Sequence, residues 1–257
     1  MKTALKQTYI LFVRSMRHIL RSPDTIMTVA IQPVLFMLLF VYVFGGAIKG
    51  SLPPSTNYVS YQLPGILIMT ISSGITYSAL RIFWDKQKGM LARLNSMPVS
   101  RSGFLWGHIF TSLVSNAISL AFVIAMAFIM GFRSSAGFLE WLGIAGILTL
   151  LTLSLTWVAV IPGLTAKTAD GAVALAYPVM FLPFISSSFV PVDTMPSAVA
   201  AFARHQPFTP MVETLRALLT GAPVGNDVWI ALAWCLGILA VAWFLAMRVY
   251  KRRLSGQ

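Results

Sequence analysis

Residues 104–130, FLWGHIFTSLVSNAISLAFVIAMAFIM, form a block without a single Asp, Glu, Lys or Arg. A helix needs about 20 predominantly apolar residues to cross the hydrocarbon core of a bilayer, so this block predicts a membrane-spanning helix. Five further apolar blocks carry no charged residue in their middle, at residues 25–44, 62–83, 139–164, 171–189 and 228–249. The sequence therefore predicts an all-α polytopic membrane protein with six transmembrane helices.

The composition leaves no room for a separate soluble domain. Of the 257 residues, 57% are hydrophobic and only 10% are charged, whereas a soluble domain carries about 25% charged residues. So little charge cannot cover a water-facing surface, and lipid is the solvent that this composition suits. We therefore expect residues 1–257 to form one transmembrane domain.

The positions of the basic residues predict the topology, because Lys and Arg concentrate in cytoplasmic loops. With a cytoplasmic N-terminus, four of the 19 basic residues lie outside: Lys49, Arg133, Arg204 and Arg216. The remainder lie inside. Both termini are therefore expected in the cytoplasm, and the chain is expected to be a multi-pass protein of the cytoplasmic membrane. The net charge of +12 is then explained by the basic residues of the cytoplasmic segments, which set the topology. A nucleic-acid partner is not expected, since no basic face is interleaved with stacking aromatic residues.

Three segments outside the predicted spans have a character of their own. Residues 1–22 are basic and amphipathic, which predicts an interfacial helix on the cytoplasmic face. Residues 85–100 connect the second and third spans, and a short helix within them is expected to end at Pro98. Residues 190–221 are too apolar for a free external loop, and they predict a re-entrant helical hairpin. Within that hairpin, Thr209-Pro210 predicts a helix start and Gly221 a helix end.

The sequence contains no recognisable catalytic or metal-binding motif. No Gly-Lys dipeptide occurs, so a phosphate-binding loop of the Walker type is absent. His18, His108, His205 and the single cysteine, Cys235, have no partner at metal-ligand spacing. All seven acidic residues lie at or beyond the span ends, which argues against an ion-driven carrier and an intramembrane protease. We expect no catalytic residue, no metal and no cofactor on this chain.

Small hydroxyl-bearing and amide residues recur at helical spacing in three of the predicted spans. Close helix–helix packing accounts for such stripes, because small residues are enriched where membrane helices meet. A weakly polar lining of a translocation path accounts for them as well, and an uncharged lining suits an amphipathic cargo better than an ion. The candidate lining residues are Ser72, Thr76, Ser112, Ser115, Asn116, Ser119, Thr149, Thr152 and Thr156.

Two stretches carry a resemblance to a known family. Residues 85–100 resemble the coupling-helix segment of ABC-2 type permeases and end in Ser96-Met97-Pro98-Val99-Ser100. Residues 189–221 resemble the external hairpin of the same family, with Gln206-Pro207-Phe208-Thr209-Pro210 and then a run from Glu213 to Gly221. Within the family, the chain is most similar to the drug-resistance branch of daunorubicin/doxorubicin exporter permeases. It departs from the pattern in one respect, because Asp85 is a single acid where the family commonly has two.

The resemblance implies a machine of several subunits. A second permease, expected as a second copy of this chain, would complete the membrane part, although a related chain is an alternative. Each permease would dock an ABC ATP-binding subunit, which would bind ATP and Mg²⁺ and perform the hydrolysis. The chain itself would therefore not be an enzyme. The residues expected to contact the ATP-binding subunit are Lys88, Met90, Leu91, Arg93, Leu94 and Met97.

The expected function is that of the permease subunit of an ATP-driven exporter. Its cargo would be hydrophobic or amphipathic compounds, with drugs favoured and antibiotic resistance as the consequence. Export of a polysaccharide or glycolipid by the same machinery is the nearest alternative. A membrane-embedded enzyme acting on lipid would need a charged or metal-binding cluster at the span ends, and the sequence shows none. A non-transporting membrane scaffold is the third alternative.

Overall fold

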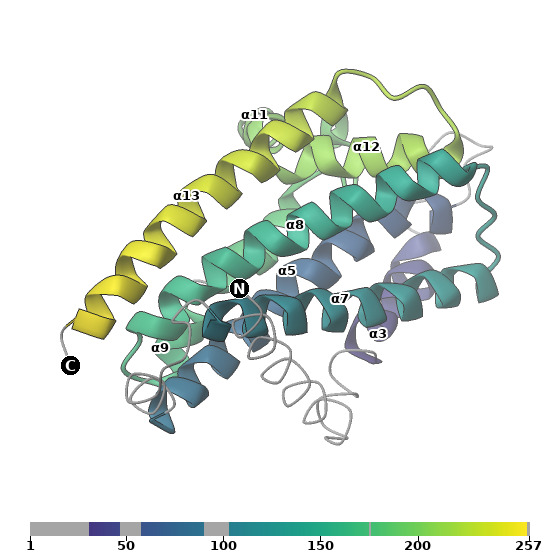
Figure 1. Cartoon of the computed structure of the whole chain (residues 1–257). Coiled ribbons are helices and arrows are strands. Elements are labelled where there is room, and N and C mark those ends of the chain that lie inside the picture. The colour runs from purple at the N-terminus through teal and green to yellow at the C-terminus, as the bar shows by residue number, and fades with distance from the viewer. Residues whose placement is uncertain (1–30, 47–57, 90–102, 175, 256–257) are drawn as a thin grey trace.

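The computed structural model describes residues 31–46, 58–89, 103–174 and 176–255 (Figure 1). Within these ranges the chain forms helices, turns and irregular connections, and no strand occurs. The all-α fold class is therefore confirmed for the described residues. The predicted interfacial helix at residues 1–22 lies outside the described residues.

Among the described residues, four helices are long and apolar enough to cross a bilayer: α5 (Tyr58–Gln87), α7 (Gly103–Ile129), α8 (Phe138–Thr165) and α13 (Asp227–Ser255). Their candidate spans contain 26 to 30 residues, which at a rise of 1.5 Å per residue gives roughly 40 Å. The hydrocarbon core is about 30 Å thick, so each helix is long enough even when tilted. These helices coincide with the second, third, fourth and sixth predicted spans, and they support a polytopic membrane protein.

The first and fifth predicted spans have a different form. The first is described from residue 31 onward, as α3 (Gln32–Leu38) followed by the π-helical segment η2 (Leu39–Phe44). The fifth is described as α9 (Ala169–Val173) before residue 175, and after it as α10 (Ala176–Phe181) followed by the 3₁₀ segment η3 (Leu182–Ile185). Pro183 lies at the start of η3, and its missing N–H removes one of the hydrogen bonds that an α-helix would form there. The number of six spans stays a prediction.

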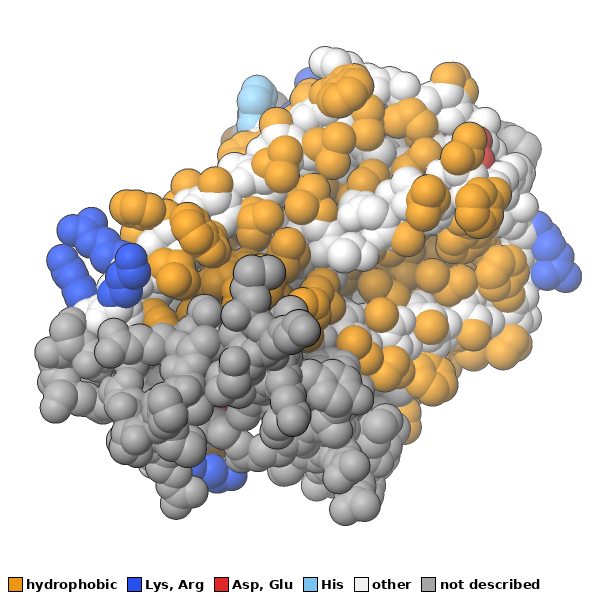
Figure 2. All heavy atoms as spheres, in the orientation of Figure 1, with side chains coloured by type: hydrophobic (Ala, Val, Ile, Leu, Met, Phe, Trp, Pro, Cys, Tyr) orange, Lys and Arg blue, Asp and Glu red, His pale blue; other side chains and the backbone are white. Residues whose placement is uncertain are grey.

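The helices differ in how much of them is covered by protein. In the apolar part of α5, 67% of the residues are buried, against 22% in α13. Helix α5 packs against α3, α7, α8, α9, α10 and α12, so it lies at the centre of the bundle. Apolar side chains cover the face over α13 in Figure 2. Trp234, Val241 and Phe244 of α13 are exposed. In a bilayer this face suits lipid, which solvates apolar side chains as well as a protein interior does.

Two glycines allow backbone segments to approach α5 closely. A Cβ atom at Gly163 of α8 would lie 2.9 Å from the carbonyl oxygen of Ala79. A Cβ atom at Gly65 of α5 would lie 2.5 Å from the Cβ of Ser188, in the connection after η3. Such distances are too short for real carbon atoms, so these two contacts require glycine. They show how small residues set the separation of helices in the bundle.

The predicted external hairpin contains two helices after the short 3₁₀ segment η4 (Val192–Thr194). Helix α11 (Ser197–His205) begins after Pro196, and helix α12 (Phe208–Thr220) begins after Pro207. The predicted helix end at Gly221 is confirmed: its φ of 67° is left-handed, and its N–H donates to the carbonyls of Ala217 and Leu218. The apolar side of α12 packs against α5, α8 and α13. Its placement relative to a membrane stays a prediction.

Candidate functional site

The predicted coupling segment joins the end of α5 to the start of α7. Lys88 is exposed in the turn after α5, and Gly89 follows with a left-handed φ of 70°. The other candidate coupling residues, Met90, Leu91, Arg93, Leu94 and Met97, lie outside the described residues. The structure thus describes the two helix ends that hold the segment, and the docking role of its residues stays a prediction.

Polar side chains connect α5 and α7 close to these two ends. The Nη2 of Arg81 on α5 donates to the Oγ of Ser112 on α7 at 2.8 Å, and the Oγ of Ser78 lies 2.8 Å from the same oxygen. One turn further on, the Oδ2 of Asp85 lies 3.3 Å from the Nε2 of His108. His108 is buried, and its ring also packs edge-on against Phe104. The single acid of the predicted coupling motif therefore faces into the bundle.

Lys86 connects the same end of α5 to α8. Its Nζ donates to the carbonyl oxygens of Leu164 at 3.2 Å and Ala166 at 2.5 Å. These carbonyls lie in the last turn of α8 and just beyond it, where no further helical N–H can reach them. A lysine at this position also complements the negative end of the α8 dipole. The ends of α5, α7 and α8 are thus held together by polar contacts.

The structure places the candidate lining residues in three kinds of environment. Thr149 is exposed on α8, and Thr76 and Ser115 are half-buried. The other candidates are buried: Ser72, Ser112, Asn116, Ser119, Thr152 and Thr156. Ser112, Asn116 and Ser119 belong to one face of α7, and Thr152 and Thr156 to one face of α8.

Most of the buried hydroxyls are satisfied within their own helix. Ser119 donates to the carbonyl of Ser115 at 3.1 Å, and Thr156 donates to the carbonyl of Thr152 at 2.7 Å. Asn116 packs where a Cβ atom on Gly74 of α5 would lie, 2.6 Å from its Oδ1. These contacts suit close helix packing, which is the first of the two interpretations of the stripes. The lining role of these residues stays a prediction.

A small groove lies between α3, α5 and α10, with room for little more than one water molecule. The sequence-predicted lining residues do not border it. Its polar groups are Gln32, Thr70 and Ser73, among apolar walls from Pro33, Phe36, Ile66, Met69 and Met180. Sequence reasoning missed this groove because its walls come from three helices. The one available signal was Gln32, an amide in a predicted apolar span, whose Oε1 lies 3.4 Å from the Tyr77 hydroxyl.

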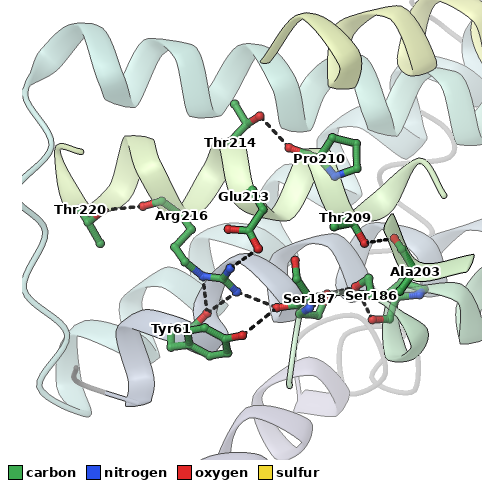
Figure 3. A network of polar contacts seen from close by, with 12 residues as sticks. Tyr61, Ser186, Ser187, Ala203, Thr209, Pro210, Glu213, Thr214, Arg216 and Thr220 are labelled. Carbon is green, nitrogen blue, oxygen red and sulfur yellow. Dashed lines mark hydrogen bonds and ion pairs between the residues drawn. The ribbon is translucent and has the colours of Figure 1, made fainter. Parts of the chain in front are cut away.

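A second polar network lies at the far end of the bundle (Figure 3). Arg216 of α12 pairs with Glu213 one turn away, with Nη1 2.6 Å from Oε1. Its Nη2 donates to the carbonyl oxygens of Ser187 at 2.7 Å and Tyr61 at 3.2 Å. The Tyr61 hydroxyl donates to the same Ser187 carbonyl at 3.3 Å. Sequence reasoning did not identify this network, although an acid and a base three residues apart in an apolar segment were a visible signal.

Comparison with known proteins agrees with this architecture. The family model of the ABC-2 type transporter matches residues 6–220. The chain is 26% identical over 98% of its length to a daunorubicin resistance ABC transporter permease protein, DrrB1 of Streptomyces coeruleorubidus, and covers 88% of that protein. It is 25% identical over 91% of its length to a probable doxorubicin resistance ABC transporter permease protein, DrrC of Mycobacterium tuberculosis, and covers 84% of it.

A further relative is a putative transport permease, ycf38 of Cyanophora paradoxa, at 27% identity over 83% of this chain and 74% of that protein. The matches span most of each partner, so they concern whole proteins rather than one shared segment. The resemblance inferred from residues 85–100 and 189–221 is therefore confirmed, and the chain belongs to the ABC-2 type transporter family.

Proposed function

We propose that the chain is the permease subunit of an ATP-driven exporter that moves hydrophobic or amphipathic compounds, such as drugs, out across the cytoplasmic membrane. The observation that carries this proposal is the match over nearly the whole chain to permeases named for daunorubicin and doxorubicin resistance. The four long apolar helices support it, since a permease must surround its path with membrane-spanning segments.

The energy source is proposed to lie on a separate ABC ATP-binding subunit, which binds ATP and Mg²⁺. That subunit contacts the coupling segment through Met90, Leu91, Leu94 and Met97, with Lys88 and Arg93 at the rim. A second permease, as a homodimer, completes the membrane part. Both termini lie in the cytoplasm, the helix at residues 1–22 lies along the cytoplasmic face, and residues 190–221 re-enter the outer leaflet.

The path itself has two candidate walls. One is the set of hydroxyl and amide side chains on α5, α7 and α8 that the sequence indicates. The other is the groove between α3, α5 and α10, which brings polar groups next to apolar walls. Ligand sites of drug-like compounds are mostly apolar hollows with a few polar groups, and this groove has that composition.

A mild-detergent pull-down of the tagged chain from its native membrane tests the proposal, with mass spectrometry of the co-purified proteins. An ABC ATP-binding subunit at about equal stoichiometry is the expected result. The reconstituted complex should then transport a fluorescent anthracycline in an ATP-dependent manner, and a hydrolysis-deficient variant of the partner subunit should not.

Other outcomes separate the alternatives. An ATP-binding subunit without anthracycline transport, but with ATP-dependent transfer of a glycolipid, would favour the polysaccharide or glycolipid exporter. Recovery of the chain without any ATP-binding subunit would contradict the exporter and favour the membrane scaffold.

A further inference from the structure

The polar contacts between α5 and α7 form two parallel rungs. Arg81 and Asp85 are four residues apart on α5, and His108 and Ser112 are four residues apart on α7, so each pair lies on one helix face. Because α5 and α7 run in opposite directions from the segment that joins them, Arg81 meets Ser112 and Asp85 meets His108. Ser78 strengthens the first rung through its 2.8 Å contact with Ser112.

The rungs lie in a largely dry part of the bundle. Ser78, His108 and Ser112 are buried at 3%, 4% and 1% exposure, and the side chain of Asp85 is 18% exposed. A buried charge that loses its partner carries a desolvation cost that water does not repay. Separating the two helices is therefore opposed here by more than the loss of packing, and this holds their relative position.

The rungs also fix the position of α7 along α5 and its rotation, which apolar packing leaves adjustable. Membrane helices gain little from hydrophobicity when they meet, because lipid solvates apolar side chains equally well. Hydrogen bonds are directional and lose strength steeply when their geometry changes. Two rungs at different heights therefore resist both sliding and rotation of α7 along α5.

We propose that Arg81, Asp85, His108 and Ser112 are positioning residues that make α5 and α7 move as one unit when the segment between them is pushed. This inference rests on the proposed function, because it needs a partner that pushes on residues 90–102. Asp85 then acts inside the bundle, holding its helix to His108, and is not a docking acid for the ATP-binding subunit.

Arg81→Gln and Asp85→Asn test the inference in the reconstituted complex. Both variants should bring down the ATP-binding subunit in normal amount and hydrolyse ATP, while anthracycline transport per ATP falls at least about fivefold. The matched controls are Arg133→Gln, exposed beyond the other end of α7, and Asp193→Asn, exposed in η4. A transport-per-ATP ratio equal to that of the unchanged chain in both variants would overturn the inference.

A covalent replacement distinguishes positioning from a general need for stability. In a Cys235→Ala background, Ser78→Cys and Ser112→Cys place two thiols where the oxygens now lie 2.8 Å apart. Oxidation by copper phenanthroline removes one hydrogen from each thiol and joins the sulfurs. In the Arg81→Gln chain this bond should restore the transport-per-ATP ratio, and reduction by dithiothreitol should abolish the rescue. A bond that forms without rescue would refute the positioning role.

The same cysteine pair tests the inference separately from the proposed function. If the unchanged chain brings down no ATP-binding subunit, the exporter proposal fails, but the rate of disulfide formation in native membranes is still measurable. Slower formation with Asp85→Asn, and not with Asp193→Asn, would support the rungs, tested here at Asp85 and His108, as the element that holds α5 to α7. Equal rates would overturn them independently of any transporter.

Discussion

The guanidinium of Arg216 lies 4.0 Å from the centre of the Tyr61 ring and also donates to the Tyr61 backbone carbonyl at 3.2 Å. The two residues are 155 positions apart in the sequence. One side chain thus attaches α12 to the beginning of the central helix α5, through a cation–π contact and a charge-assisted hydrogen bond.

Replacing Arg216 should loosen the attachment of α12. Arg216→Met removes the cation–π contact and leaves the Ser187 carbonyl with one donor fewer, so we expect a loss of about 2 kcal/mol in the free energy of unfolding. Thermal unfolding of the purified protein in mild detergent measures the change. Arg204→Met is the matched control, because its ion pair with Asp193 is exposed on both sides and should contribute nothing measurable. Equal melting temperatures for the two variants would contradict the assigned role.

Gly163 should tolerate no side chain. Gly163→Ala forces a Cβ atom against the Ala79 carbonyl and Ile82, and we expect a destabilisation of about 1–3 kcal/mol as α8 moves away from α5. Gly146→Ala on the same helix is the control, since no atom lies within 4 Å of the new Cβ. The control should be neutral or slightly stabilising, because alanine favours the helix over glycine. Both are read from unfolding in detergent, and a neutral Gly163→Ala would show that the bundle adjusts freely there.

Charge in the coupling segment should separate hydrolysis from transport. Leu91→Glu or Leu94→Glu would place a carboxylate in the proposed apolar contact with the ATP-binding subunit, where an unpaired charge is costly. We expect the protein to remain in the membrane and drug resistance of the host cells to be lost. Leu91→Met, which conserves volume and polarity, should retain resistance. Normal resistance in the glutamate variants at equal expression would refute the docking assignment.

A bulky residue in the groove between α3, α5 and α10 should obstruct cargo. Ser73→Trp places a large ring at the groove, and we expect anthracycline transport to fall while the complex still assembles. Val241→Trp on the exposed face of α13 should leave transport unchanged. Thr149→Trp tests the sequence-predicted lining in the same assay. Loss of transport with Thr149→Trp, and not with Ser73→Trp, would move the path from the groove to α8.

The helices that depend on a single local signal could be predicted from the sequence. Residues 104–130 and 139–164 are long and apolar and carry no charge in their middle, and a helix forms there because lipid offers the backbone no hydrogen-bond partner. The left-handed end of α12 at Gly221 was equally accessible, since the preference of glycine for that conformation is local. The division of the fifth span was missed because an apolar run with Pro178 and Pro183 has the same hydropathy whether it is continuous or broken.

The polar contacts were less predictable than the helices. A stripe such as Ser112, Asn116 and Ser119 has the same spacing whether its residues pack against another helix or line a path. Only the neighbouring residues in space distinguish the two roles. That Asp85 faces His108 depends on how α7 returns alongside α5, which no spacing within either segment encodes. The groove has the same origin, because its walls come from distant parts of the chain.

The interruption at Pro183 has a consequence for how this part of the chain can change over time. Where the helix breaks, carbonyl groups lose the N–H partners that a continuous helix would supply, and lipid cannot replace them. The missing donors come from elsewhere: Gln206 reaches the Ile185 carbonyl at 2.8 Å, and Arg216 and Tyr61 share that of Ser187. The break and its distant donors therefore depend on one another. Without Gln206 and Arg216, the Ile185 carbonyl would lose this donor and the Ser187 carbonyl would keep only the Tyr61 hydroxyl.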